Sequence, residues 1–275
     1  MYLSKKKIPP EERLIFALDV PSVEEALQLV DELGHSVKFY KLGLELFMAG
    51  GYYELIRQLR ERGKKIFADL KFFDVPETVG RAVRQLKSRG VTFATVHGND
   101  RMLEAAVREK GEVKILAVTV LTSHDQSDYD DITVLAGVDQ NDLNNLSIKV
   151  NVKSLVLSRA ERALKIGCDG VISSGLEAPA LRKEFGEKFI IVTPGIRAEK
   201  NVDDQIRTVN VEEAFKNGAD YIVVGRPIKN APNRKAIAED IQKRIAAIFT
   251  PTNSGKRKPK KASAHSLSRS IAHLP

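Results

Sequence analysis

The sequence is poor in cysteine and contains no long hydrophobic run. Cys168 is the single cysteine among 275 residues, so the chain cannot form an internal disulfide framework, and one thiol suits a reducing cytoplasm. No stretch approaches the roughly 18 continuous apolar residues that a membrane span needs. The first residues, MYLSKKKIPPEERL, are basic but lack the apolar segment of a secretory signal. These features predict a cytoplasmic protein that does not enter the membrane.

Metal-ligand sets and nucleotide-binding glycine motifs are missing too. The five histidines lack the spacing of a metal site, and there is no G-x-S-x-G, C-x-x-C or Rossmann glycine pattern. His97, in the stretch TVHGND, ends an apolar run, and a structural hydrogen-bonding role is favoured over a catalytic one. The sequence therefore predicts no metal and no cofactor.

The positive charge of the chain is concentrated at its two ends. The formal net charge is +8, but residues 251–275 hold six basic and no acidic residues, and residues 5–7 add three lysines. Removing these nine from the 44 basic residues leaves 35 against 36 acidic ones, a net charge of −1 for residues 8–250. A near-neutral body argues against a nucleic-acid-binding module, the alternative that the basic ends suggest. The Pro-, Ser- and Lys-rich tail is predicted to be disordered and solvated.

Short apolar runs alternate with segments of helical periodicity through the body of the chain. The runs, rich in Val, Ile and Leu, occupy 14–20, 39–44, 65–72, 92–98, 114–123, 170–175, 189–196 and 221–228. Such runs are typical of parallel strands that are covered on both faces. Eight strand-helix units predict a single α/β domain, a (β/α)8 TIM barrel over residues 12–250, since an open doubly wound sheet normally has fewer strands. A basic lead-in (1–11) and the disordered tail (251–275) complete the predicted organisation.

Charged residues gather where the predicted strands end, which is where barrel enzymes place their catalytic groups. FADLKFFDVPET puts Asp69 and Lys71 two residues apart, on the same side of a strand, with Asp74 in the loop that follows. The other polar residues at strand ends are Asp19, Lys41 and Thr122. A structural ion pair is the alternative for the third strand, but buried pairs add little net stability. Carboxylates and ammonium groups that meet at one barrel mouth predict a catalytic site.

Glycine and arginine follow the last two predicted strands. The residues concerned are Pro194, Gly195 and Arg197 in VTPGIR, and Gly225 and Arg226 in VVGRPI. Glycine lets backbone N–H groups approach a phosphate, and an arginine fork pairs with its oxygens. Phosphate sites of barrels often follow strands seven and eight. This pattern predicts a phosphorylated small substrate, whose phosphate Gln205 in VDDQIRTV could also reach.

Several of these segments resemble the orotidine 5′-phosphate decarboxylase family. FADLKFFDVPET is similar to the family signature D-x-K-x-x-D-[IV]-P-x-T. FALDV, YKLGLELF, VTVLTS, VTPGIR and VVGRPI are similar to further family segments, in the family's order, so the resemblance covers about residues 12–248. Two segments depart from the pattern: VHGND lacks the small residues expected after the histidine, and ISSGLE has Gly175 where alanine is usual.

The resemblance implies cofactor-free decarboxylation of orotidine 5′-phosphate to UMP, the last step of de novo pyrimidine biosynthesis. It makes Lys71 the proton donor to C6 of the base, with Asp69 beside the substrate carboxylate and Lys41 and Asp74 completing a Lys-Asp-Lys-Asp chain. It also implies a homodimer, in which Asp74 and Thr78 reach the partner's site. The implied substrate-binding residues are Asp19 and Lys41 for the ribose, Thr122 for the pyrimidine, and Gln205, Arg197, Gly225 and Arg226 for the phosphate, next to Pro194 and Gly195.

The closest alternative is a magnesium-dependent decarboxylase or aldolase of the same barrel group, acting on ketose or ulosonate phosphates. That group shares D-x-K-x-x-D but has a carboxylate at the position of Lys41, and usually Ala-Gly in place of Val75 and Pro76. An ammonium group would repel a metal cation, so the sequence favours the metal-free reaction.

Overall fold

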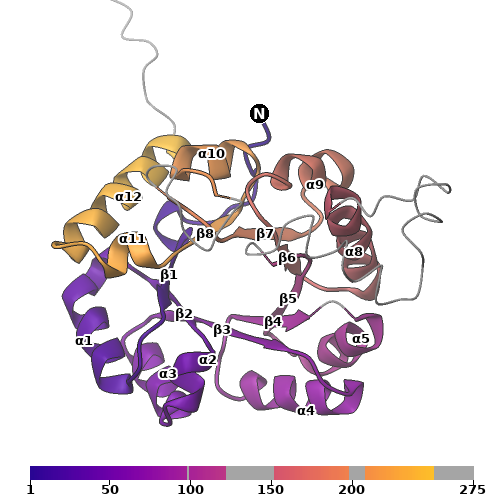
Figure 1. The fold of residues 1–275 in the computed structure, drawn as a ribbon, viewed down its shortest axis with the longest axis horizontal. Coiled ribbons are helices and arrows are strands. Elements are labelled where there is room, and N and C mark those ends of the chain that lie inside the picture. Colours follow the sequence, from indigo (N-terminus) through magenta and orange to yellow (C-terminus); the bar gives the residue numbers. More distant parts are fainter. Residues whose placement is uncertain (98, 122–151, 198–207, 251–275) are drawn as a thin grey trace, which may run out of the picture.

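The computed structural model describes residues 1–97, 99–121, 152–197 and 208–250. Eight parallel strands, each paired with its neighbours in chain order, form a closed barrel, and Figure 1 shows them as a ring surrounded by helices. This confirms the predicted (β/α)8 barrel. The strands are β1 (Leu14–Leu18), β2 (Phe39–Leu42), β3 (Lys65–Phe72), β4 (Phe93–His97), β5 (Lys114–Val118), β6 (Gly170–Ile172), β7 (Ile190–Thr193) and β8 (Tyr221–Val224).

Helices follow the strands and pack on the outside of the ring (Figure 1). They are α1 (Val23–Leu33), α2 (Leu44–Met48), α3 (Tyr52–Glu61), α4 (Pro76–Lys87), α5 (Asp100–Glu109), α8 (Val152–Ile166), α9 (Ala178–Phe185), α10 (Val211–Lys216), α11 (Arg226–Lys229) and α12 (Arg234–Phe249), with 3-10 turns η1 (Pro10–Glu12) and η2 (Gly34–Ser36). No helix in the described ranges is long and apolar enough to cross a membrane.

Local sequence sets where these helices begin and end. Helix α1 begins where the Ser22 side chain accepts a hydrogen bond from the backbone N–H of Glu25, at 3.1 Å. It ends at Gly34, whose φ is +51°, a value that glycine adopts at no steric cost. Helix α4 begins at Pro76, where the fixed φ of proline suits the first turn.

Except for β3, the strands are shorter than the apolar runs that predicted them. The eighth run extends to residue 228, whereas β8 ends at Val224. The reason is local, because Gly225 turns the chain and Pro227 lies in the first turn of the short helix α11. The fifth run likewise outlasts β5, which ends at Val118. The residues beyond the strands form the connections at the carboxyl end of the barrel, where the predicted site residues lie.

Two apolar layers hold the barrel together, one inside it and one between strands and helices. The inner layer consists of Ile15, Ala17, Phe39, Phe67, Phe93, Leu116, Ile190, Val192, Tyr221 and Val223. Since alternate residues of a strand face the same side, the next inward positions are Lys41 on β2, Asp69 on β3 and Thr95 on β4. Polar side chains therefore continue the inward rows immediately above an apolar plug.

A buried ion network closes the opposite, amino-terminal end of the barrel. Asp220, which immediately precedes β8, is fully buried. Its carboxylate accepts hydrogen bonds from Arg182 Nη2 at 2.5 Å, from the backbone N–H of Ile191 at 2.8 Å and from the Ser4 hydroxyl. Lys6 Nζ lies 3.3 Å from the same carboxylate. The network ties residues of the predicted lead-in to the barrel, far along the strands from the predicted site.

Replacing Asp220 by alanine should destabilise the protein without impairing the chemistry of the folded enzyme. The change leaves the buried guanidinium of Arg182 without its carboxylate, and breaking such a pair costs about 3–5 kcal/mol. Ser4→Ala, which removes one neutral partner, should cost no more than about 1.5 kcal/mol. Urea unfolding measures both losses. A variant Asp220→Ala as stable as the wild type would contradict this role of the network.

Candidate active site

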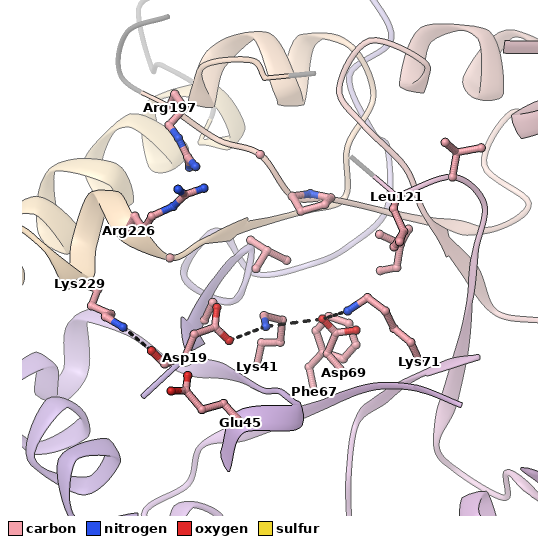
Figure 2. A pocket seen from close by; sticks show the side chains of 17 residues that line it. Asp19, Lys41, Glu45, Phe67, Asp69, Lys71, Leu121, Arg197, Arg226 and Lys229 are labelled. Atoms are coloured by element: carbon pink, nitrogen blue, oxygen red, sulfur yellow. Dashed lines mark hydrogen bonds and ion pairs between the residues drawn. The ribbon is translucent and has the colours of Figure 1, made fainter. Parts of the chain in front are cut away.

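A cavity of about 490 Å³ opens at the carboxyl end of the barrel strands. Its volume suits a small phosphorylated ligand. The predicted site residues that line it are Asp19, Lys41, Asp69, Lys71, Pro194, Gly195, Arg197, Gly225 and Arg226. Figure 2 shows the charged ones in two groups, a row of carboxylates and ammonium groups along β1 to β3 and a pair of arginines across the cavity.

The row of charges alternates in sign from one strand to the next. Lys41 Nζ lies 2.9 Å from Asp19 Oδ1 and 3.6 Å from Asp69 Oδ2. Lys71 Nζ lies 2.9 Å from the same Oδ2 atom of Asp69. Figure 2 shows the row as one chain of contacts. The carboxylate of Asp69 is thus held between two ammonium groups, in a side chain that is 11% exposed.

Electrostatics keeps the two most buried members of this row, Lys41 and Asp69, charged. Burial alone would raise the pKa of Asp69, but the ammonium groups of Lys41 and Lys71 outweigh burial and hold the pKa below its ordinary value. Burial would lower the pKa of Lys41, but the carboxylates of Asp69 and Asp19 outweigh it and raise that pKa. Lys41 and Asp69 therefore present an ammonium group and a carboxylate, both charged at neutral pH, to a ligand.

Lys71 has an unusual backbone conformation. Its φ of +46° lies in the left-handed region, which costs a residue with a side chain about 1–2 kcal/mol. The strand pairing is irregular at the same place, since the register between β3 and β4 shifts between Ala68 and Phe72. Strain of this kind persists only where the surroundings fix it, and it is often found at functional sites. Here it accompanies the side chain that is predicted to donate the proton.

The two arginines come from the connections after β7 and β8. Arg197 is mostly buried, and in Figure 2 its guanidinium group faces that of Arg226 over the cavity. Gly195 precedes Arg197 with a φ of +77°, which only glycine adopts readily. Gly225 caps the helix that Arg226 begins. Two guanidinium groups beside glycine turns form a site that suits a phosphate.

Of the predicted residues, two do not line the cavity and two lie outside the described part of the chain. Asp74 and Thr78 are exposed, Asp74 in the loop after β3 and Thr78 in the first turns of α4. Thr122 and Gln205 lie outside the described residues. His97 is also absent from the cavity lining, and its ring packs edge-on against Phe73 with centroids 5.5 Å apart.

Sequence reasoning missed three polar residues at the site. Lys229 and Glu45 line the cavity, and Lys229 Nζ donates a hydrogen bond to the backbone carbonyl of Asp19. Lys229 follows Arg226 by three residues, so helical spacing could have placed both on one side of α11. Thr95 lies two residues before His97 on β4, and the alternation of the strand could have found it.

Metal-ligating side chains are not clustered in the described part of the chain. No group of three or more His, Cys, Asp or Glu residues there is arranged to hold a metal ion. The carboxylates of Asp19 and Asp69 instead face the ammonium group of Lys41. The arrangement can bind an anionic ligand and place a charged ammonium group beside it.

The shifted pKa values predict how stability depends on pH. Between about pH 5 and 9, the difference in unfolding free energy between wild type and Asp69→Asn should be constant. Below about pH 4 the difference should shift against the wild type, because Asp69 gains a proton in the unfolded chain before it does in the folded one. Above about pH 10 it should do so again, because folded Lys41 keeps a proton that the unfolded chain loses.

Chemical denaturation of both proteins across this range measures the difference. A difference that stays flat from about pH 3 to 11 would show that Asp69 is not held between opposite charges.

Known proteins of one family match the chain over most of its length. The family model that matches residues 12–241 is described as the orotidine 5′-phosphate decarboxylase / HUMPS family. A protein of Methylococcus capsulatus named orotidine 5′-phosphate decarboxylase is 55% identical over 250 residues, which are 90% of this chain and 98% of that protein. A protein of the same name from Stenotrophomonas maltophilia is 44% identical over 252 residues, which are 90% of this chain and 99% of that protein.

A solved structure agrees with this match. The crystal structure of orotidine 5′-phosphate decarboxylase from Lactobacillus acidophilus has a TM-score of 0.69 and 35% identity, and the match covers 85% of this chain and 99% of that one. The family model, the relatives and the fold all indicate the same family. The chain belongs to the orotidine 5′-phosphate decarboxylase family.

Proposed function

We propose that the protein decarboxylates orotidine 5′-phosphate to UMP, the last step of de novo pyrimidine biosynthesis, without metal or cofactor. The observation that carries the proposal is the Asp69 carboxylate between Lys41 and Lys71 at the cavity. The ammonium group of Lys41 occupies the position where the magnesium-dependent alternative has a carboxylate, and it would repel a metal cation. The single cysteine of the chain supports an enzyme of the cytoplasm.

The arginine pair supports a phosphorylated substrate. Arg197 and Arg226 would hold the phosphate, with Pro194, Gly195 and Gly225 letting the backbone approach it. Asp19 and Lys41 would hold the ribose hydroxyls, between the phosphate and the charged row. Thr122 and Gln205 would contribute to the pyrimidine and the phosphate, as the family pattern implies. In this arrangement the base would lie beside Lys71.

The chemistry then needs one proton donor and one carboxylate. The bond between C6 and the carboxylate carbon breaks, carbon dioxide leaves, and the electron pair stays on C6, where no π system delocalises it. The ammonium group of Lys71 stabilises this charge as it develops and then donates a proton to C6. Asp69 lies beside the departing carboxylate and favours its loss, and binding of the remote phosphate offsets that repulsion. Lys71 regains its proton from solvent.

Lys71→Ala should lower kcat at least about 1,000-fold while leaving the fold intact, because it removes both the cation and the proton donor. The loss of substrate ultraviolet absorbance measures turnover, and a wild-type kcat in Lys71→Ala would refute the mechanism.

EDTA should leave the wild-type rate unchanged. Loss of activity with EDTA and its recovery with magnesium would support the metal-dependent alternative.

We also propose that the active unit is a homodimer, in which Asp74 and Thr78 complete the partner's site. Asp74 and Thr78 are exposed and do not line the cavity of their own subunit. Apolar side chains flank Asp74, with Phe73 68% and Val75 62% exposed. Further exposed apolar side chains follow the neighbouring strand β2, at Leu44, Phe47 and Met48. Exposed apolar groups gathered on adjacent connections are typical of an interface between subunits.

Mixing two inactive variants tests this sharing of sites. In a hybrid of Lys71→Ala and Asp74→Ala subunits, one site would combine both defects, and the other would have an intact Lys71 and an intact Asp74. Random reassociation of equal amounts should therefore restore roughly one quarter of the wild-type activity.

The matched control mixes Lys71→Ala with Lys41→Ala. Both of these residues act within their own subunit, so this mixture should stay inactive. Absence of recovery in the first mixture, with hybrid dimers present, would show that Asp74 serves its own subunit.

A further inference from the structure

The strand pairing beside the charged row leaves one β4 residue opposite three residues of β3. Ala68 pairs with Ala94 and Phe72 pairs with Val96. Residues 69–71 therefore all lie opposite Thr95, and the regular backbone ladder is interrupted where Asp69 and Lys71 occur. Something other than the ladder must satisfy the polar groups of this segment, because buried backbone N–H groups are rarely left unpaired.

The Thr95 hydroxyl forms hydrogen bonds with two polar groups of this segment. Its Oγ1 atom accepts a hydrogen bond from the backbone N–H of Lys71 at 2.9 Å. The same hydroxyl donates to Asp69 Oδ1, also at 2.9 Å. Thr95 is fully buried and faces inward, two residues after Phe93 of the inner apolar layer. One hydroxyl thus links the backbone of one charged residue to the carboxylate of the other.

The two oxygens of Asp69 are divided between different partners. Oδ2 faces the ammonium groups of Lys41 and Lys71, whereas Oδ1 accepts the hydrogen bond from Thr95. A carboxylate held through both oxygens is fixed in the orientation of its plane as well as in position. The hydrogen bond that the Lys71 N–H donates to Thr95 Oγ1 restrains the backbone of the residue whose φ is +46°. The hydroxyl therefore restrains both a strained backbone and the plane of a carboxylate.

We propose that Thr95 is a positioning residue for the decarboxylation, and that its hydroxyl sets the relative geometry of the Lys71 ammonium group and the Asp69 carboxylate. Thr95 itself touches neither the proton nor the departing carboxylate. A small error in the placement of reacting groups lowers the rate strongly, although the ligand still binds. The inference rests on the proposed function, since it concerns the step that Lys71 and Asp69 carry out.

The experiment compares three substitutions of buried threonines. Thr95→Val keeps the shape of the side chain but removes the donor and the acceptor, whereas Thr95→Ser keeps the hydroxyl. Thr193→Val is the matched control, because Thr193 is also a fully buried strand residue and its Oγ1 has no hydrogen-bond partner in the described part of the chain. Each protein is assayed for kcat, KM, UMP affinity and thermal unfolding.

We expect Thr95→Val to lower kcat by roughly 10- to 100-fold. KM and UMP affinity should change by less than about threefold, since phosphate and ribose contacts are untouched. Thr95→Ser should retain kcat within about fivefold, and Thr193→Val should behave as the wild type.

Four results would overturn the inference. The first is a Thr95→Val variant with wild-type kcat, and the second is an equal loss in Thr95→Val and Thr95→Ser. The third is a loss that appears in KM, UMP affinity and thermal stability together, which would mark Thr95 as structural. The fourth is a Thr95→Val chain that fails to fold while Thr95→Ser folds but is inactive, which would also mark Thr95 as structural. A wild-type protein that does not convert orotidine 5′-phosphate would refute the proposed function instead.

Discussion

The site depends on one buried carboxylate that must stay charged. Asp69 is ionised inside the barrel because Lys41 and Lys71 approach the same oxygen from two different strands. Lys41 in turn stays charged in a buried place because the carboxylates of Asp69 and Asp19 outweigh burial and raise its pKa. Removing any member would leave the others with uncompensated charge. The strands of the barrel make this possible, because they bring groups that are far apart in sequence to one mouth.

The barrel separates this arrangement from the interactions that stabilise it. At the amino-terminal end, Asp220 and Arg182 form a buried pair, and Asp220 also accepts a hydrogen bond from the backbone N–H of Ile191. Between the two ends lies the inner layer of aromatic and aliphatic side chains, including Phe39, Phe67 and Phe93. The carboxyl end can therefore hold strained and closely spaced charges. Strain at Lys71 is tolerated since the rest of the barrel supplies the stability.

The apolar runs were enough to predict the barrel, since eight Val- and Ile-rich segments have few other ways to bury both faces. The charges at strand ends predicted the row of Asp19, Lys41, Asp69 and Lys71, because carboxyl ends of parallel strands converge. Thr95 and the left-handed Lys71 were not predicted. Both depend on a shift of register between β3 and β4. The register between two strands cannot be predicted from the residue pattern of either strand alone. The proposed role of Asp74 and Thr78 stays a prediction, because neither residue lines the cavity of its own chain.

The most direct test of the account is the crystal structure of the enzyme with bound UMP. We expect the phosphate to contact both Arg197 and Arg226, and C6 of the uracil to lie about 3–4 Å from Lys71 Nζ. The Asp69 carboxylate should then lie next to the space in front of C6 that the departing carboxylate occupies. A phosphate bound away from the two arginines, or a base with C6 turned away from Lys71, would contradict the account.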